Sequence, residues 1–118
     1  MAARDSMFTD IDRMDAAGWA SYLAPEAVMR FGNADPVHGR EACRDALQSF
    51  YETIAGLRHD LIEQWEHPPA TIVESEVTYT RKDGRDVTVP VVTIYRVNDD
   101  DLIADYRVFI DLAPVFAD

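Results

Sequence analysis

The sequence predicts an α+β fold, in which a cone-shaped, curved antiparallel (mixed) sheet wraps around N-terminal helices and encloses a pocket. Three observations support this prediction. Helical apolar patterns fill the first half of the chain, and residues 76–114 read as three consecutive antiparallel strands. Asp83-Gly84 lies between two alternating apolar runs, a strong hairpin signal because both central positions of a type I′ turn need a positive φ.

Two helices are expected in the first half of the chain. The first starts near Phe8 and ends at or just before Pro25, and the stretch 15–18 interrupts or bends it, because Gly is a poor helix interior and Asp a good cap. A short strand over residues 27–31 and a loop over residues 32–36 follow. The second helix runs from about residue 40 to residue 55, and Gly56 ends it; its apolar face is formed by Cys43, Ala46, Leu47, Phe50 and Ile54.

Four longer strands are predicted over residues 57–65, 71–81, 86–97 and 102–112. The strand over residues 86–97 is apolar on both faces, with Val91 on one face and Val92 on the other. A strand buried on both faces lies in the middle of a sheet or inside an oligomer interface. We expect the interface: one sheet face covers the pocket and the other packs on a second subunit, which gives a homodimer.

Composition limits the classes of function. The 118 residues carry a net charge of −11 and no basic cluster, so we expect one domain over residues 1–118 and no nucleic-acid partner. No apolar run reaches the ~18 residues that a membrane span needs, and no secretory signal is expected at the N-terminus. The single Cys43 fits a cytoplasmic protein.

Cofactor sites are not predicted either. The three histidines, His38, His59 and His67, lack metal-ligand spacing, and neither a glycine-rich phosphate loop nor a nucleophile elbow occurs in the sequence. We therefore expect neither a metal nor a cofactor. The expected partner is a small hydrophobic molecule.

Three segments resemble the nuclear transport factor 2-like superfamily in its SnoaL-like branch: residues 22–28 (YLAPEAV), 37–42 (VHGREA) and 103–111 (IADYRVFID). The resemblance spans nearly the whole chain and implies the fold described above. It implies no single activity, because this fold hosts unrelated functions. Members include ketosteroid isomerases, limonene epoxide hydrolases, scytalone dehydratases and polyketide cyclases.

The catalytic groups of ketosteroid isomerases are missing. Alignment with them places their tyrosine on Met7, their aspartate base on Phe31 and their second aspartate on Val92, and none of these replacements transfers a proton. The sequence therefore does not predict that isomerase activity.

The catalytic set of limonene epoxide hydrolases is also incomplete. One of their two aspartates falls on Val108, and their arginine and other aspartate fall near Glu74 and Glu76. This arrangement cannot polarise an epoxide as theirs does.

Scytalone dehydratases give the nearest match in polar groups. Their tyrosine–aspartate pair falls on Ile11 and Asp12, and one of their two pocket histidines falls on His59. We expect His59 to act as acid–base, Asp12 to orient it or hold a water, and Glu76 to be a second proton-transfer group if it faces the pocket. Each residue also has a structural alternative. His59 could be a strand-end histidine outside the pocket, Asp12 a solvated helix charge, and Glu76 an outward-facing glutamate.

The expected pocket walls are mostly apolar, with one polar residue, Asn33, at the rim. The residues expected to bind a ligand are Trp19, Phe31, Asn33, Trp65, Val92, Tyr106, Val108 and Ile110. Three classes of function remain open. They are a cofactor-independent isomerase, cyclase, dehydratase or hydrolase acting on an apolar oxygenated substrate, a non-catalytic hydrophobic-ligand-binding module, and a dimeric interaction module.

Overall fold

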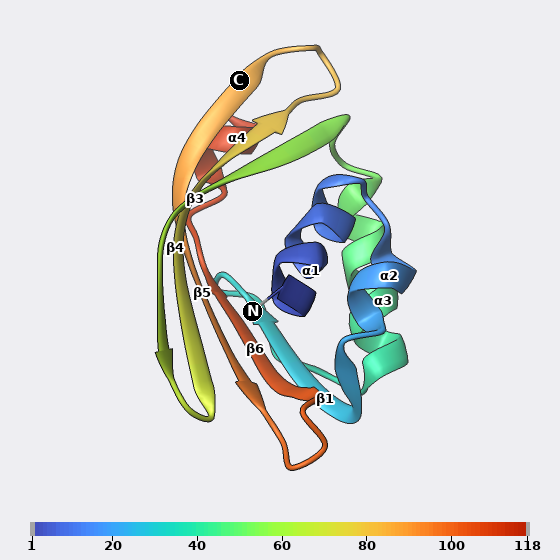
Figure 1. The fold of residues 1–118 in the computed structure, drawn as a ribbon. Coiled ribbons are helices and arrows are strands. Elements are labelled where there is room, and N and C mark those ends of the chain that lie inside the picture. The colour runs from blue at the N-terminus through green and yellow to red at the C-terminus, as the bar shows by residue number, and fades with distance from the viewer. Residues whose placement is uncertain (1, 118) are drawn as a thin grey trace.

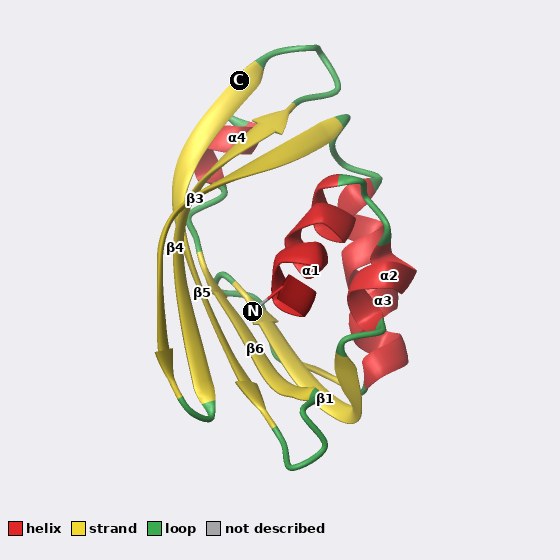
Figure 2. Cartoon of the chain, in the orientation of Figure 1, coloured by secondary structure: helices red, strands yellow, loops and turns green. Residues whose placement is uncertain are grey.

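The computed structural model describes the backbone of residues 2–117 and the side chains of residues 6–117. Figures 1 and 2 show α1, α2 and α3 grouped on the concave side of a curved sheet. The elements in chain order are α1 (Ala2–Asp12), α2 (Ala16–Ala20), β1 (Leu23–Phe31), β2 (Val37–His38), α3 (Arg40–Tyr51), β3 (Gly56–His67), β4 (Ala70–Thr80), β5 (Asp86–Val97), β6 (Ile103–Phe109) and α4 (Ala113–Phe116).

The sheet has six strands in the order β2-β1-β6-β5-β4-β3. Neighbouring strands are antiparallel except β1 and β6, which are parallel, so the sheet is mixed. This confirms the predicted fold class. The core lies between the concave face and the helices, and it includes Met7, Trp19, Leu23, Val73 and Tyr95, each no more than 1% exposed.

The break between α1 and α2 occurs where the sequence predicts an interruption. Met14 has a φ of 59°, and Asp15 caps α2 by accepting a hydrogen bond from the Gly18 amide at 2.9 Å. The chain therefore turns after Asp12 and does not extend α1 as one longer helix. This turn leaves Asp12 at the C-terminal end of α1, next to β3.

Several boundaries differ from those predicted. The second helix ends at Tyr51 and not at Ala55, because a turn closes there: the Thr53 amide and hydroxyl both donate to the carbonyl of Phe50. The strand predicted from residue 27 begins at Leu23, and the last strand stops at Phe109 and is followed by the short helix α4.

The hairpin between β4 and β5 has a loop one residue longer than that of a type I′ turn. Only Gly84 has a positive φ, at 89°, while the Gly84 amide donates to the carbonyl of Arg81 and the Arg81 amide donates to that of Arg85. This is a three-residue loop with glycine at the left-handed position. The expectation of positive φ at both Asp83 and Gly84 is therefore wrong.

A bulge divides β3 into two halves. Leu61 pairs with Ser75 and Glu63 with Glu74, so Ile62 is an extra residue on β3. Before the bulge, His59 pairs with the buried Val77 and faces the concave side. After it the faces are exchanged, so that odd-numbered residues point to the outer face of the sheet.

Candidate functional site

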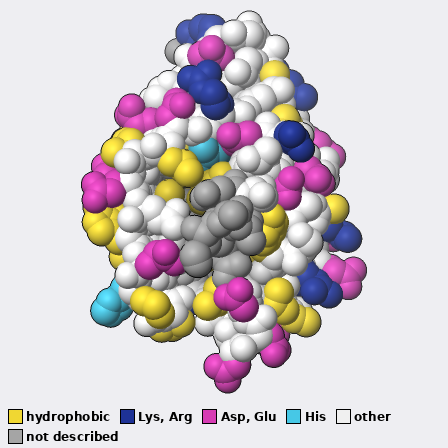
Figure 3. Space-filling view, viewed as in Figure 1, with side chains coloured by type: hydrophobic (Ala, Val, Ile, Leu, Met, Phe, Trp, Pro, Cys, Tyr) yellow, Lys and Arg dark blue, Asp and Glu magenta, His cyan; other side chains and the backbone are white. Residues whose placement is uncertain are grey.

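A cavity lies between the concave face of the sheet and the helices. It leaves about 40 Å³ for the centre of a water-sized sphere, which is room for roughly three water molecules. Figure 3 shows hydrophobic side chains gathered near the middle of this face of the molecule, with charged side chains around them. The lining consists of Ile11, Trp19, Met29, Phe31, Leu47, Phe50, Leu57, His59, Tyr79, Val91, Thr93, Tyr106 and Val108.

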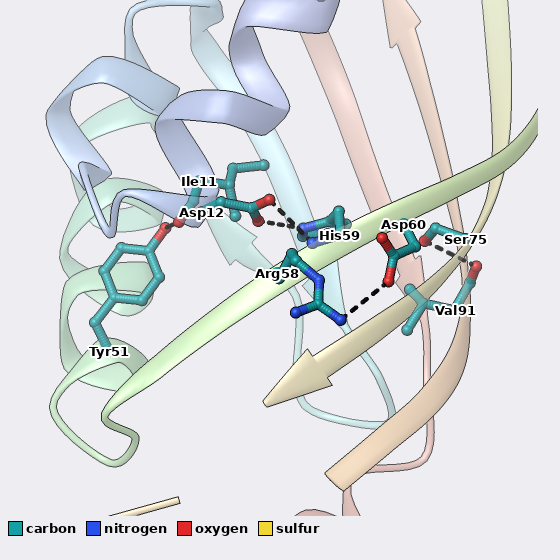
Figure 4. Close-up of polar contacts among 8 residues, drawn as sticks. All are labelled: Ile11, Asp12, Tyr51, Arg58, His59, Asp60, Ser75 and Val91. Atoms are coloured by element: carbon teal, nitrogen blue, oxygen red, sulfur yellow. Dashed lines mark hydrogen bonds and ion pairs between the residues drawn. The ribbon is translucent and has the colours of Figure 1, made fainter. Parts of the chain in front are cut away.

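His59 contributes the imidazole in this cavity, and Asp12 fixes it. The ring Nδ1 lies 2.6 Å from Asp12 Oδ1, and the His59 main-chain amide donates to Asp12 Oδ2 at 2.9 Å. The His59 side chain is 9% exposed and the Asp12 side chain 26% exposed. Figure 4 shows the carboxylate at the end of α1 and the imidazole on β3 pointing toward each other.

This geometry sets the tautomer of the neutral ring. An ionised carboxylate only accepts hydrogen bonds, so Nδ1 carries the hydrogen that points at Asp12. Nε2 is then the unprotonated nitrogen, free to accept a proton. Because His59 also lines the cavity, the pair has the arrangement of a general base held by a carboxylate.

Two aromatic side chains support the pair. Phe8 on α1 packs on the imidazole, with ring centroids 5.2 Å apart. The hydroxyl of Tyr51 on α3 donates to the carbonyl of Ile11 at 2.9 Å, in a buried position (Figure 4). Since Ile11 precedes Asp12, this bond anchors the end of α1 from which the carboxylate extends.

Phenols surround the inner part of the cavity. Burial raises the pKa of Tyr51, Tyr79 and Tyr106 well above the usual range, and in Tyr51 and Tyr79 the negative charge of Asp12 adds to this rise. These phenols stay neutral at ordinary pH. Two of the three residues, Tyr79 and Tyr106, line the cavity.

The indole of Trp19 meets the Tyr106 ring edge to face, with centroids 5.2 Å apart. The indole N–H makes no hydrogen bond of good geometry with a described residue. It lies close enough to the Tyr106 phenol to lower the pKa of Tyr106, against the larger rise caused by burial. A buried donor of this kind is unusual in a folded protein.

Of the residues predicted for catalysis, the structure brings Asp12 and His59 together and leaves Glu76 apart. Glu76 is exposed and pairs across the sheet with Asp60 and Pro90, on the outer face. It points away from the cavity, so the expectation of a pocket-facing Glu76 is wrong. The physical reason is the register of β4, in which the buried Ser75 and Val77 occupy the concave face.

Four of the predicted wall residues line the cavity and four do not. Trp19, Phe31, Tyr106 and Val108 contribute to the lining. Trp65 and Val92 lie on the outer face, where Trp65 pairs with Ile72 and Val92 with Phe109. Asn33 is exposed on the turn after β1 and accepts a hydrogen bond from Arg30 at 3.2 Å, and Ile110 packs against the core beyond the end of β6.

Several lining residues were not predicted. Val91 and Thr93 stand where Val92 was expected, one position away on β5. Tyr79 shares the concave face of β4 with Val77, and the sequence signal for it was the alternation of apolar residues along that strand. Leu47 and Phe50 belong to the apolar face of α3, which reads as core and not as pocket wall.

Two kinds of feature are absent from the part of the chain that the structure describes. No group of three or more His, Cys, Asp or Glu side chains lies close enough together to hold a metal ion. No helix in residues 2–117 is long and apolar enough to cross a membrane.

Comparison with known proteins identifies relatives of this architecture. The SnoaL-like domain model matches residues 5–106. An NTF2-like protein of unknown function from Burkholderia pseudomallei K96243 has a TM-score of 0.86 at 19% identity, over 99% of this chain and 97% of that chain. None of the curated proteins matches this chain.

Two other solved structures involve small molecules or enzymes. TerC, co-crystallised with polyporic acid, has a TM-score of 0.82 at 16% identity, over 95% of this chain and 91% of that chain. An LEH-like epoxide hydrolase of M. tuberculosis has a TM-score of 0.79 at 15% identity, over 98% of this chain and 84% of that chain. Such low identities show the shared NTF2-like fold and leave the activity open.

Proposed function

Because the chain belongs to the SnoaL-like domain family, we propose that it is a cofactor-independent enzyme that moves a proton on an apolar, oxygenated small molecule. His59 is the general acid–base and Asp12 the carboxylate that orients it. The reaction class is an isomerisation, cyclisation, dehydration or hydrolysis. One observation carries the proposal: a histidine that lines an apolar cavity is bonded at Nδ1 to a carboxylate at 2.6 Å.

The chemistry follows from the two ends of the imidazole. Nε2 takes a proton from the substrate or from a water, while the negative charge of Asp12 stabilises the imidazolium that forms. The same nitrogen then returns the proton to another atom of the bound molecule. Apolar walls around the ring exclude water, so the transferred proton stays with the reacting pair.

Proton abstraction can be measured before the natural substrate is known. The protein is incubated in D₂O with a panel of neutral ketones, epoxides and β-hydroxy ketones, and C–H to C–D exchange and product formation are followed by NMR and mass spectrometry. We expect exchange or turnover of at least one class, and its loss in His59→Gln.

A matched control comes from the same strand. His67 is exposed at the far end of β3, so His67→Gln makes the same chemical change outside the cavity and should retain the activity. If the panel binds but neither exchanges nor reacts, the acid–base proposal fails. The cavity is then the pocket of a non-catalytic ligand-binding module, which its largely apolar lining also suits.

We also propose that the protein is a homodimer joined through the outer face of the sheet. Cross-strand pairs place Trp65 beside Ile72 and Val92 beside Phe109, and Trp65 and Phe109 are 44% and 49% exposed. An apolar area of this kind on an otherwise charged surface favours association. The apolar residues of the outer face are Trp65, Ile72, Pro90, Val92, Ile94 and Phe109.

The charges flanking this area suit a second copy of the chain. Carboxylates lie mainly on the β3–β4 side and arginines mainly on the β1–β6–β5 side. Two copies related by a two-fold axis would set one side against the other. The carboxylates on the first side are Asp60, Glu63, Glu74 and Glu76, where Arg58 pairs with Asp60, and the arginines on the other side are Arg30, Arg96 and Arg107, where Asp105 pairs with Arg96.

A further inference from the structure

A second cavity lies behind the wall of the first. It is bounded by β1, the turn after it, β2 and α3, and it leaves about 180 Å³ for the centre of a water-sized sphere, several times the volume beside His59. Its lining is apolar except for Asp35 at the turn. The residues of this outer chamber are Met29, Phe31, Ala34, Asp35, Val37, Ala46, Leu47 and Phe50.

Four residues line both spaces: Met29, Phe31, Leu47 and Phe50. Met29 and Leu47 are buried in the core, whereas the two phenylalanines are only half-buried. The Phe31 and Phe50 rings lie against each other with centroids 5.2 Å apart. The less buried part of the partition is therefore a pair of aromatic side chains, groups that turn about two bonds without moving the backbone.

The backbone around the outer chamber is well fixed. Gly32 has a φ of 58° and its amide donates to the carbonyl of Val108 at 2.9 Å. The Arg30 guanidinium donates to the Ala34 carbonyl at 3.1 Å and to Asn33 at 3.2 Å. These bonds keep the turn in one shape, so the chamber does not depend on a loose loop.

The volume beside His59 raises a difficulty for the proposed function. Room for a few water molecules holds only the smallest organic molecules, yet the adjoining chamber offers apolar space for the rest of a larger one. We propose that the two chambers form one ligand site, divided in the free protein by the Phe31–Phe50 pair. The outer chamber holds the unbranched apolar tail of a neutral molecule whose oxygenated end meets His59.

The placement of the oxygenated end at His59 rests on the proposed function. The placement of the apolar tail rests on the outer chamber alone. Neutrality of the tail follows from its surroundings. The lining offers no cation, Asp35 lies at its edge, and the whole chain carries a net charge of −11. A chain that ends in a carboxylate would be repelled by Asp35 and by the net negative charge of the protein.

The test uses a series of methyl ketones from 2-butanone to 2-undecanone, added to the protein labelled at the His59 ring and at alanine methyl groups. The affinity should rise about three- to fourfold for each added methylene until the outer chamber is full. Short ketones should shift the His59 ring signals alone, and longer ones should also shift the methyl signals of Ala34 and Ala46.

Ala46→Phe fills the outer chamber without touching the cavity beside His59, because Ala46 lines only the outer one. We expect this variant to bind 2-butanone as the wild type does and to lose the gain in affinity with chain length. Ala42→Phe is the matched control, since Ala42 is exposed on the same helix and lines neither chamber. Ala34→Leu, at the exposed turn, is a second variant that fills the chamber if Ala46→Phe does not fold.

The outcomes separate the two proposals. If 2-butanone shifts His59 but affinity does not grow with chain length, the outer chamber is no part of the site while the proposed function stands. If no ketone shifts the methyl signals of Ala34 and Ala46, the inference is overturned whatever His59 does. If long ketones shift the alanine signals and never those of His59, the chambers are separate sites, and the acid–base proposal loses its ligand.

Discussion

Asp12 accepts two hydrogen bonds from a single residue, one from the ring of His59 at 2.6 Å and one from its main-chain amide at 2.9 Å. The carboxylate thus fixes both the orientation of the imidazole and the strand position from which it extends. An amide in place of the carboxylate could accept only one of these bonds and would direct an N–H at the other donor.

Asp12→Asn should therefore reverse the tautomer of His59 or displace its ring. With the hydrogen moved to Nε2, the nitrogen facing the cavity no longer accepts a proton, and we expect turnover or exchange to fall about a hundredfold or more. Nitrogen-15 shifts of the imidazole report the tautomer directly. Asp60→Asn, on the exposed side of β3, is the matched control, and wild-type rates with an unchanged tautomer in Asp12→Asn would remove Asp12 from the mechanism.

Tyr51→Phe should reduce stability and loosen the end of α1. The variant removes one of the two hydrogen bonds that the Ile11 carbonyl accepts, the other coming from the Met14 amide, which costs about 0.5–1.5 kcal/mol of unfolding free energy. Urea denaturation measures this change. Tyr22→Phe, at a half-buried position, should stay within about 0.5 kcal/mol of the wild type. Equal stability of the two variants would show that the Tyr51 hydrogen bond has no structural weight.

The buried phenols predict a loss of stability at high pH. The pKa of Tyr51, Tyr79 and Tyr106 is raised in the folded protein, so the unfolded chain releases these protons first. The stability they contribute is complete below about pH 10, the unfolded pKa, and is lost as the pH rises above it. Absorbance at 295 nm and circular dichroism should change together in one cooperative step. Smooth ionisation of all tyrosines with the fold intact would contradict this.

Phe109→Glu should convert the dimer to a monomer, because the substitution places a charge in the middle of the apolar area of the outer face. Light scattering coupled to size-exclusion chromatography measures the mass. Phe116 on α4 is equally exposed, at 49%, and lies outside that area, so Phe116→Glu should leave the mass unchanged. A wild-type protein that is monomeric at micromolar concentrations would refute the dimer.

The sequence predicted the order of the main elements, the break near Asp15 and the pairing of Asp12 with His59, which lines the cavity. Glycine, aspartate caps and alternating apolar runs are local signals, and they report on local structure. The resemblance to scytalone dehydratases supplied the link between Asp12 and His59, residues that lie far apart in the chain. Periodicity by itself does not show which strand packs beside which helix.

The side of the sheet on which a residue falls was the part most often mistaken. In β5 both faces carry valines, so the pattern does not decide between Val91 and Val92. In β3 the extra Ile62 shifts the alternation, and a count of two from His59 then puts Trp65 on the wrong side. Glu76 was misplaced by the same uncertainty in register, which depends on a single residue in the hairpin.

The bulge at Ile62 also ties together two properties that could otherwise vary independently. If the same residues paired regularly with β4 and formed no bulge, Trp65 would turn inward and occupy space on the concave side, while Gln64 and Glu66 would turn outward and make the outer face more polar. A change in how β3 pairs at this point would thus exchange capacity for a ligand against capacity for self-association. Point substitutions in β3 lack that effect, because each of them alters only one face.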